Sequence, residues 1–178
     1  MKSIILIPIS DYFASRKKVF KKFLFPLIVS LSALFLSILF NIGSSEKIVS
    51  IFSEFIGTQI SIVAILISFS VAIITILVSA DNNNIKRLKE TESSKEQYKP
   101  VHGKQLSLFQ ILLSNIAYNV VTEIIYLVRL IAISLIQTIF PIYLFKYITS
   151  ICIFTILHIL FVLLESVSQM YLTFWAKK

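Results

Sequence analysis

The sequence predicts an all-α membrane protein with four transmembrane helices. Three observations support this: an apolar composition, long stretches with few or no charges, and basic residues concentrated outside those stretches. Hydrophobic residues make up 57% of the 178 residues and charged residues 15%, against roughly 45–50% and about 25% in soluble globular domains. The stretch from Phe55 to Ala80 has no charge and no proline. About 20 such residues cross the hydrocarbon core of a bilayer, so this stretch is long enough to span it.

Residues 1–22 do not have the order of a signal peptide. The apolar run from Ile4 to Ile9 is broken by Pro8, and the basic cluster RKKVFKK follows it, whereas a signal peptide has its basic residues first. We expect a cytoplasmic, interfacial segment whose Tyr12 and Phe13 rest on the bilayer surface. An arm that docks a partner is the alternative.

Residues 23–80 are expected to form the first two transmembrane helices. The first runs from about Phe23 to Asn41, with Pro26 in its first turn, and a turn over residues 41–45 follows. In the second, Phe55 to Ala80, small and hydroxylated residues recur at steps of three or four and so share one face. These residues are Gly57, Ser61, Ala64, Ser68, Ala72, Thr75 and Ser79. Such a stripe favours close packing against another helix, in the same subunit or the next; pore lining is the alternative.

Residues 81–104 form the one sizeable polar segment, predicted to be a cytoplasmic loop with six basic and four acidic residues. This mixture is too balanced for a nucleic-acid patch, so we expect no direct binding of nucleic acid. A docking surface for a cytoplasmic protein fits better, and a merely solvated loop is the simpler alternative. The docking candidates are Lys86, Arg87, Lys89, Lys95 and Lys99.

Residues 105–178 are expected to form a long helical hairpin with a bend at Pro141. Each arm measures about 50 Å at ~1.5 Å per residue, so we expect the cytoplasmic halves to project beyond the bilayer. In such a hairpin Asn115 falls near Gln169, and His158 near the level of Glu123.

Polar side chains inside the hairpin are the candidates for function. Ionisable groups at membrane depth cost several kcal/mol unless they are paired or hydrated. They therefore mark either an ion pathway or contacts between helices and subunits, and both interpretations stay open. The candidates are Asn115, Asn119, Glu123, Arg129, His158 and Glu165.

The distribution of Lys and Arg predicts the topology. With four spans and a cytoplasmic amino terminus, residues 1–22, 81–104 and 177–178 hold six, six and two basic residues, or fourteen of seventeen. The opposite orientation would translocate these fourteen, against the positive-inside rule. We therefore expect both termini in the cytoplasm.

No motif indicates an enzyme, a metal site or a cofactor. The chain lacks a glycine-rich phosphate loop, GxSxG, HExxH and CxxC, and the single Cys152 excludes an internal disulfide. We therefore expect a non-enzymatic protein. Because four spans offer little interior for an arginine and two glutamates, we also expect a closed homo-oligomer, taken as a tetramer.

The layout resembles the small four-span membrane subunits of bacterial antiphage defence systems such as Kiwa and Hailong. The resemblance rests on the start RKKVFKK, the span GTQISIVAILISFSVAIITILVSA followed by DNNNIKRLKE, and the long polar-striped hairpin. It implies a bacterial inner-membrane protein whose cytoplasmic partner handles nucleic acid or nucleotides. No functional residue is carried over by it.

The leading hypothesis is therefore an oligomeric inner-membrane defence subunit that anchors a cytoplasmic partner and either senses or permeabilises the membrane, including as an ion channel. Two alternatives remain open. One is a holin-like or superinfection-exclusion protein that acts alone, and the other is a small transporter component.

Overall fold

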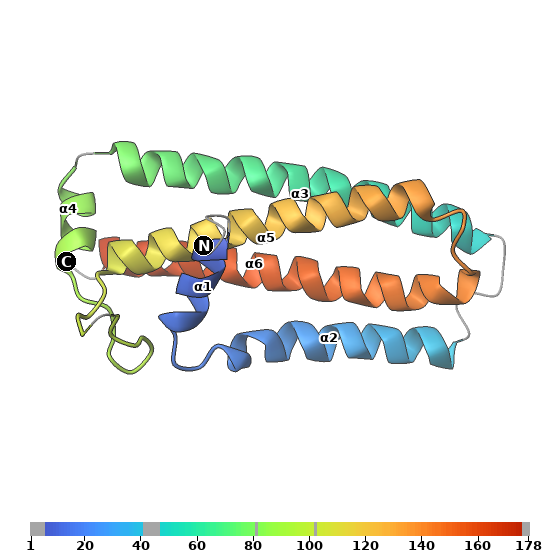
Figure 1. Ribbon diagram of the computed structural model, residues 1–178, viewed down its shortest axis with the longest axis horizontal. Coiled ribbons are helices and arrows are strands. Elements are labelled where there is room, and N and C mark those ends of the chain that lie inside the picture. The colour runs from blue at the N-terminus through green and yellow to red at the C-terminus, as the bar shows by residue number, and fades with distance from the viewer. Residues whose placement is uncertain (1–5, 41–46, 81, 102, 176–178) are drawn as a thin grey trace. The chain divides into compact units, whose positions relative to one another are not determined.

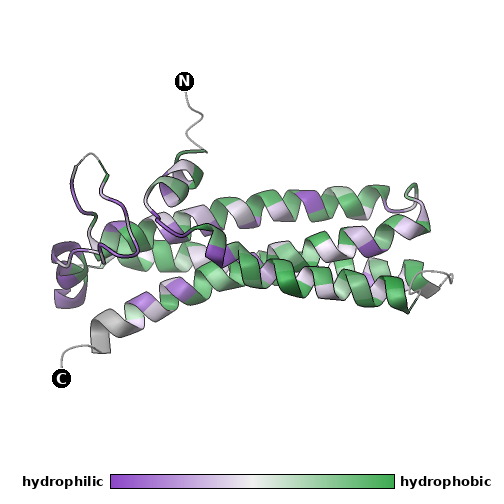
Figure 2. Ribbon diagram, turned by 90° about the horizontal axis from the view of Figure 1, so that it is seen from below, coloured by the Kyte–Doolittle hydropathy of each residue, from purple (hydrophilic) through white to green (hydrophobic). Residues whose placement is uncertain are grey.

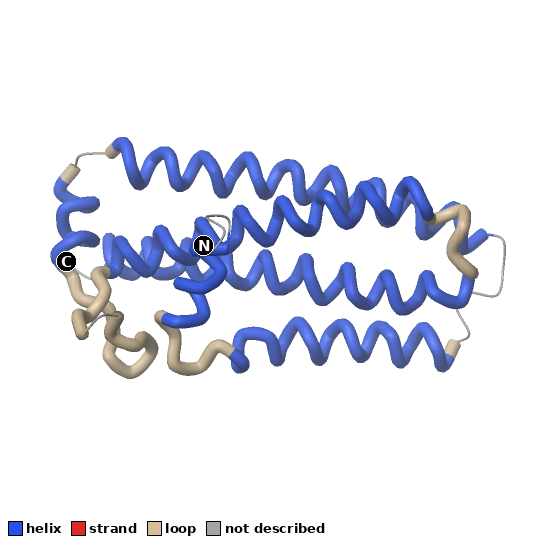
Figure 3. Tube along the Cα trace, in the orientation of Figure 1, coloured by secondary structure: helices blue, strands red, loops and turns tan. Residues whose placement is uncertain are grey.

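All four apolar segments are helices in the structure, a computed structural model that describes residues 6–40, 47–80, 82–101 and 103–175 (Figure 1). Within these described ranges, four helices are long and apolar enough to cross a membrane: α2 (Phe20–Leu39), α3 (Lys47–Ser79), α5 (Leu108–Ile136) and α6 (Phe145–Trp175). Helices and loops account for the whole described chain, without a strand (Figure 3). The prediction of an all-α, four-span membrane protein is confirmed.

Two helix starts differ from the predicted ones. Helix α2 begins at Phe20 and already includes six residues before Pro26, so the prediction that this proline lies in the first turn is wrong. Helix α3 begins at Lys47, before the predicted start at Phe55, so Glu54 lies on the helix. Hydropathy marks the part of a helix suited to lipid, whereas the hydrogen-bonded helix continues through polar residues. The turn predicted over residues 41–45 lies outside the described residues.

The polar segment after α3 contains a helix of its own, α4 (Asn83–Glu90), which is coloured as hydrophilic in Figure 2. The side chain of Asn82 caps it, its Oδ1 accepting a hydrogen bond from the Ile85 backbone N–H at 2.9 Å. Ile85 and Leu88 are buried. This part of the segment is therefore an ordered helix that packs on the protein, and docking of a partner on it stays a prediction.

Pro141 separates α5 from a short 3₁₀ turn, η2 (Ile142–Leu144), that leads into α6. The bend predicted at this proline is confirmed.

The chain divides into two compact units, each described by itself. Unit 1 comprises Met1–Val19, Ser68–Thr122 and Leu160–Lys178, and unit 2 comprises Phe20–Ile67 and Glu123–Ile159. Helices α3, α5 and α6 contribute residues to both units. The sequence suggested four consecutive segments, whereas each unit combines residues that are distant in the sequence. The reason is that helices pack side by side, and the two ends of a long helix contact different neighbours.

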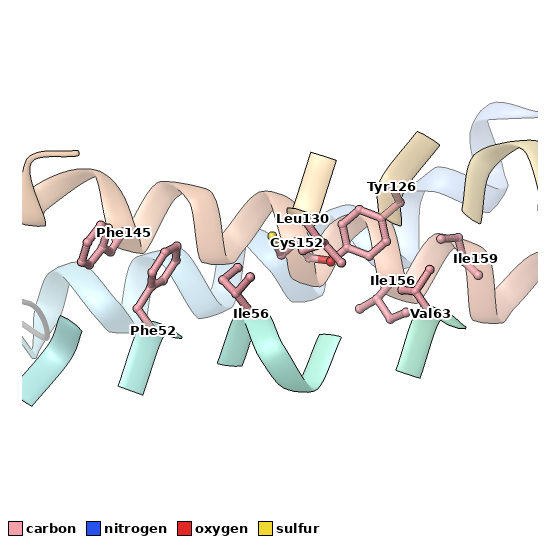
Figure 4. Close-up of a cluster of buried hydrophobic side chains, with 9 residues drawn as sticks. All are labelled: Phe52, Ile56, Val63, Tyr126, Leu130, Phe145, Cys152, Ile156 and Ile159. Carbon is pink, nitrogen blue, oxygen red and sulfur yellow. The ribbon is translucent and has the colours of Figure 1, made fainter. Parts of the chain in front are cut away.

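Unit 2 is held by apolar helix faces. Nine buried residues of α3, α5 and α6 form its core (Figure 4): Phe52, Ile56, Val63, Tyr126, Leu130, Phe145, Cys152, Ile156 and Ile159. The rings of Phe52 and Phe145 stack with centroids 4.2 Å apart. The Tyr126 hydroxyl donates to the Cys152 carbonyl oxygen at 3.1 Å and lies 3.3 Å from Gln59 Oε1. The one phenol in this core therefore has polar neighbours, as burial requires.

Helix α2 joins unit 2 through contacts with α6. The Ser150 hydroxyl donates to the carbonyl oxygen of Ser30 at 2.8 Å. The ring of Phe23 stacks on His158, with centroids 4.3 Å apart. The small serine side chains and the flat rings of Phe23 and His158 therefore allow α2 and α6 to pack closely.

Unit 1 has a small aromatic core that includes the amino-terminal helix α1 (Ile7–Ala14). Tyr12 is fully buried, and its ring stacks on that of Tyr118 with centroids 3.9 Å apart and planes 10° from parallel. The prediction that Tyr12 rests on the bilayer surface is wrong, because this ring packs inside the protein. Phe13 is 43% exposed.

Candidate functional site

A buried polar cluster in unit 1, centred on Arg16, is the most elaborate arrangement of charged side chains in the described chain. Arg16 follows α1 and is 3% exposed. Its Nη1 donates to both carboxylate oxygens of Glu165 on α6, at 3.1 and 3.0 Å, and its Nη2 donates to Asn115 Oδ1 on α5. One guanidinium thus links the amino-terminal segment to two transmembrane helices. An arginine suits this role because its donors are fixed in one plane.

Tyr98 and Gln169 complete the Arg16 cluster. The Tyr98 hydroxyl donates to Glu165 Oε1 at 3.4 Å and accepts from Gln169 Nε2 at 2.5 Å. Gln169 also donates to Glu165 Oε1 at 3.3 Å, and its own Oε1 accepts from Asn115 Nδ2 at 3.4 Å. The predicted proximity of Asn115 and Gln169 is confirmed. The carboxylate of Glu165 is therefore surrounded by donors, which offsets the cost of burying its charge.

Aromatic rings cover the guanidinium. Its carbon lies 4.2 Å from the centroid of the Tyr12 ring and 5.7 Å from that of Tyr98. Cation–π attraction in a desolvated site reaches about 2 kcal/mol. The rings therefore both exclude water and stabilise the charge.

The backbone holds Arg16 and Tyr98 side by side. The Lys17 N–H donates to the Gln97 carbonyl at 3.1 Å, and the Lys99 N–H donates to the Ser15 carbonyl at 2.8 Å. These bonds flank an isolated antiparallel bridge between Arg16 and Tyr98. The amino-terminal segment and the segment after α4 are consequently joined by main-chain hydrogen bonds as well as by side chains.

Burial raises the pKa of Tyr98, and the nearby Glu165 carboxylate adds to the effect while Arg16 opposes it. Burial likewise raises the pKa of Tyr12, against the attraction of Arg16. Both phenols therefore stay protonated at neutral pH. Tyr98 can donate to the carboxylate only in that form.

The basic side chains predicted to dock a partner are all exposed. Lys86, Arg87 and Lys89 lie on α4, while Lys95 and Lys99 lie in the segment that follows it. That segment is fastened to the start of α5: the Ser93 N–H donates to Leu106 O and the Leu108 N–H to Thr91 O, both at 2.9 Å. The exposed charges are thus carried by a folded frame and not by an unstructured loop.

The other predicted pore residues occupy different environments. Glu123 is fully buried, Asn119 is 1% exposed and His158 is 4% exposed. Arg129 is exposed at the side of α5 and lines a cavity of about 170 Å³. The structure thus brings Glu165 and Asn115 into the Arg16 cluster of unit 1, and it places Glu123, His158 and Arg129 in unit 2.

The small-residue stripe of α3 faces outward along its whole length. All seven residues, Gly57, Ser61, Ala64, Ser68, Ala72, Thr75 and Ser79, are exposed. A Cβ added to Gly57 would meet no atom within 4 Å. The alternative in which this stripe packs within the same subunit is therefore wrong; packing against another subunit stays a prediction.

Arg16, Tyr98 and Tyr12 are the members of the cluster that sequence reasoning missed. Arg16 belongs to the basic run that the positive-inside rule already explains. Its position in that run does not distinguish it from the lysines beside it. Tyr12 precedes it by four residues, the spacing that brings side chains together on a helix, and this was the one available hint.

No group of three or more metal-binding side chains occurs among the described residues. A cavity of about 480 Å³ in unit 1 is lined mainly by residues of α1 and α5, with Asp11, Gln110 and Ser114 among its polar members. No protein-family model, curated protein or solved structure matches the chain.

Proposed function

We propose that the protein is an oligomeric membrane subunit that anchors a soluble protein partner through the exposed basic side chains of α4 and the segment after it. The observation that supports the proposal most is the fixed presentation of these side chains. Helix α4 is capped by Asn82 and anchored by the buried Ile85 and Leu88. A surface whose backbone is already ordered pays less conformational entropy on binding.

In this proposal residues 1–22 and 81–104 lie in the cytoplasm, because they carry the basic clusters that the positive-inside rule assigns there. Both termini lie there too, and the membrane is a bacterial inner membrane. The resemblance to antiphage defence subunits gives the setting, in which the partner handles nucleic acid or nucleotides and the membrane subunit senses or permeabilises the membrane.

Charge reversal on α4 tests the docking surface. We expect the triple variant Lys86→Glu, Arg87→Glu, Lys89→Glu to lose the soluble partner that co-purifies with the wild type. These side chains are exposed, and Lys89 adds a surface cation–π contact with Phe109 at 5.2 Å, so helix content by circular dichroism should change only slightly.

The matched control is Lys18→Glu, Lys21→Glu, Lys104→Glu, which changes net charge equally at exposed positions off α4. Equal partner recovery from both triple variants would contradict a specific role for α4.

Orientation is tested with Lys95→Cys in a Cys152→Ser background, where the new thiol is the only one in the chain. We expect a membrane-impermeant maleimide to label it only after the cells are permeabilised. Labelling of intact cells would overturn the cytoplasmic placement.

Ion conduction by the oligomer is the second candidate, and the fully buried Glu123 in a candidate span favours it. Buried ionisable groups at this depth occur both in ion pathways and in contacts between helices. Planar-bilayer recordings should compare the wild type with Glu123→Gln and Arg129→Ala. Unchanged conductance and selectivity in both variants would remove these residues from any pathway.

A further inference from the structure

Two opposite charges in unit 2 lie exposed on candidate transmembrane helices. Glu54 is on α3 and Arg129 on α5, and within the described chain neither forms an ion pair or a side-chain hydrogen bond. An unpaired charge near the hydrocarbon core costs several kcal/mol. Each of these side chains is therefore stabilised by water or by an opposite charge that lies outside the described part of the chain.

The two charges lie at similar depths along their helices. Glu54 is seven residues after Lys47, the first residue of α3, and Arg129 is seven before Ile136, the last of α5. Seven residues correspond to about 10 Å of helix.

Two contacts confirm this register. Gln137 donates to Ser53 Oγ at 3.3 Å, and the Tyr126 hydroxyl lies 3.3 Å from Gln59 Oε1. Helices α3 and α5 are thus antiparallel neighbours, and Arg129, between Tyr126 and Gln137 in the chain, lies at about the depth of residues 53–59.

The faces that carry the charges are complementary in shape. Glu54 precedes Gly57 by three residues and Ser61 by seven, so it continues the exposed small-residue stripe of α3. On α5, Ile125 and Val128 lie beside Arg129 and are 44% and 61% exposed. A groove of small residues accepts a ridge of large aliphatic ones.

Charge complementarity favours a second copy of the chain as the occupant of these faces. A lipid phosphate would neutralise Arg129 and leave Glu54 unpaired. A second copy brings both an acid and a base at the required depth, so every charge gains a partner. Contacts of this head-to-tail kind close into rings when the rotation between copies allows it.

We propose that Glu54 of one copy pairs with Arg129 of the next, where the ridge around Val128 packs into the Gly57–Ser61 end of the stripe. This inference rests on the proposed homo-oligomer and names the residues that build its interface. It concerns unit 2 and is independent of partner docking by unit 1.

Charge exchange tests the pair, with native mass spectrometry of the purified full chain as the measurement. We expect Glu54→Arg or Arg129→Glu alone to weaken self-association by at least about tenfold, since like charges then meet. The double variant Glu54→Arg/Arg129→Glu should regain wild-type association. Lys146→Glu, a reversal near the same helix ends, is the matched control and should associate as the wild type does.

Co-expression of two complementary charge variants tests the pair more strictly. A tagged Glu54→Arg chain and an untagged Arg129→Glu chain should co-purify with each other, because their mixed interfaces restore opposite charges. Failure of both the double variant and the mixture to associate, with helix content intact, would overturn the proposed pair.

Disulfide trapping gives a measurement that does not depend on charge. Gly57→Cys combined with Val128→Cys in a Cys152→Ser background should form intermolecular disulfides on mild oxidation in native membranes, since the Gly57 position is open. Monomers alone would count against the interface.

Other outcomes separate the remaining possibilities. Normal association of Glu54→Arg, together with weakened association of Arg129→Glu that phosphatidylglycerol restores, would identify a lipid phosphate as the occupant and overturn the pair. A wild-type protein that is monomeric in native membranes would overturn the proposed oligomer itself. An oligomer indifferent to every charge exchange would overturn only this interface.

Discussion

The two units of this protein are stabilised by different kinds of interaction. Unit 2 is held by apolar helix faces, with Phe52 stacked on Phe145 at its core. Unit 1 is held by an arginine buried against a carboxylate, an amide and two tyrosine rings. The difference shows how segments too polar to span a membrane can still be fixed firmly to helices that do.

The substitution Phe52→Ala tests the apolar core of unit 2 and should have the largest effect. Removing the ring leaves a cavity among buried neighbours, and such truncations cost about 3–5 kcal/mol. We expect unfolding at a markedly lower denaturant concentration in mixed micelles, followed by circular dichroism. Phe69→Ala, which removes a 49% exposed ring from the same helix, is the control and should unfold nearly as the wild type does.

Arg16→Ala tests the polar side. Loss of the guanidinium leaves Glu165 and Asn115 without their main donor, and removing one partner of a buried ion pair costs about 3–5 kcal/mol. Because the Glu165 side chain is 23% exposed, we expect about 2–4 kcal/mol.

The loss from Arg16→Ala should be confined to unit 1. Hydrogen exchange should accelerate in the amides of α1 and leave those of α3 near Phe52 protected. Uniform acceleration in both units would show that the two do not respond separately. Arg16→Lys should recover only part of the protection, since one ammonium cannot replace the planar donor set.

A subtler test removes a single hydroxyl from each unit. Tyr126→Phe and Tyr98→Phe each delete one phenol oxygen, at an expected cost of about 1 kcal/mol for Tyr126 and somewhat more for Tyr98, whose hydroxyl donates to a carboxylate. The thermal unfolding midpoints of the two variants measure the contrast. Equal shifts would mean that the charge on Glu165 adds nothing to the Tyr98 bond.

Alkaline pH should lower the stability of unit 1, and we expect this effect to be smaller than those of the substitutions above. Because burial raises the folded-state pKa of Tyr12 and Tyr98 above the unfolded value, their contribution is complete below about pH 10. It is lost as the pH rises from there through the folded-state values.

Tyrosinate absorbance and α1 hydrogen exchange should therefore change together only above about pH 10. The Tyr98→Phe variant should show a weaker pH dependence. Loss of α1 protection already near pH 8 would contradict burial of these phenols.

Sequence alone determined the membrane class, the number of spans and the bend at Pro141, because hydropathy and proline geometry are local properties. It also identified the depth at which Asn115 meets Gln169, since two helices joined by a tight turn keep a common register. Helix ends were less predictable, as the early start of α3 shows.

Only the tertiary structure decided which charges are paired. Arg16 and Glu165 lie 149 positions apart, and apart from Tyr12 four residues earlier nothing local distinguishes Arg16 from the lysines that follow it. The same holds for the α3 stripe: its spacing predicts one face, but only the packing of the other helices shows that this face is left open. A periodic pattern reports which side chains share a surface, whereas the identity of the neighbour depends on contacts between distant segments.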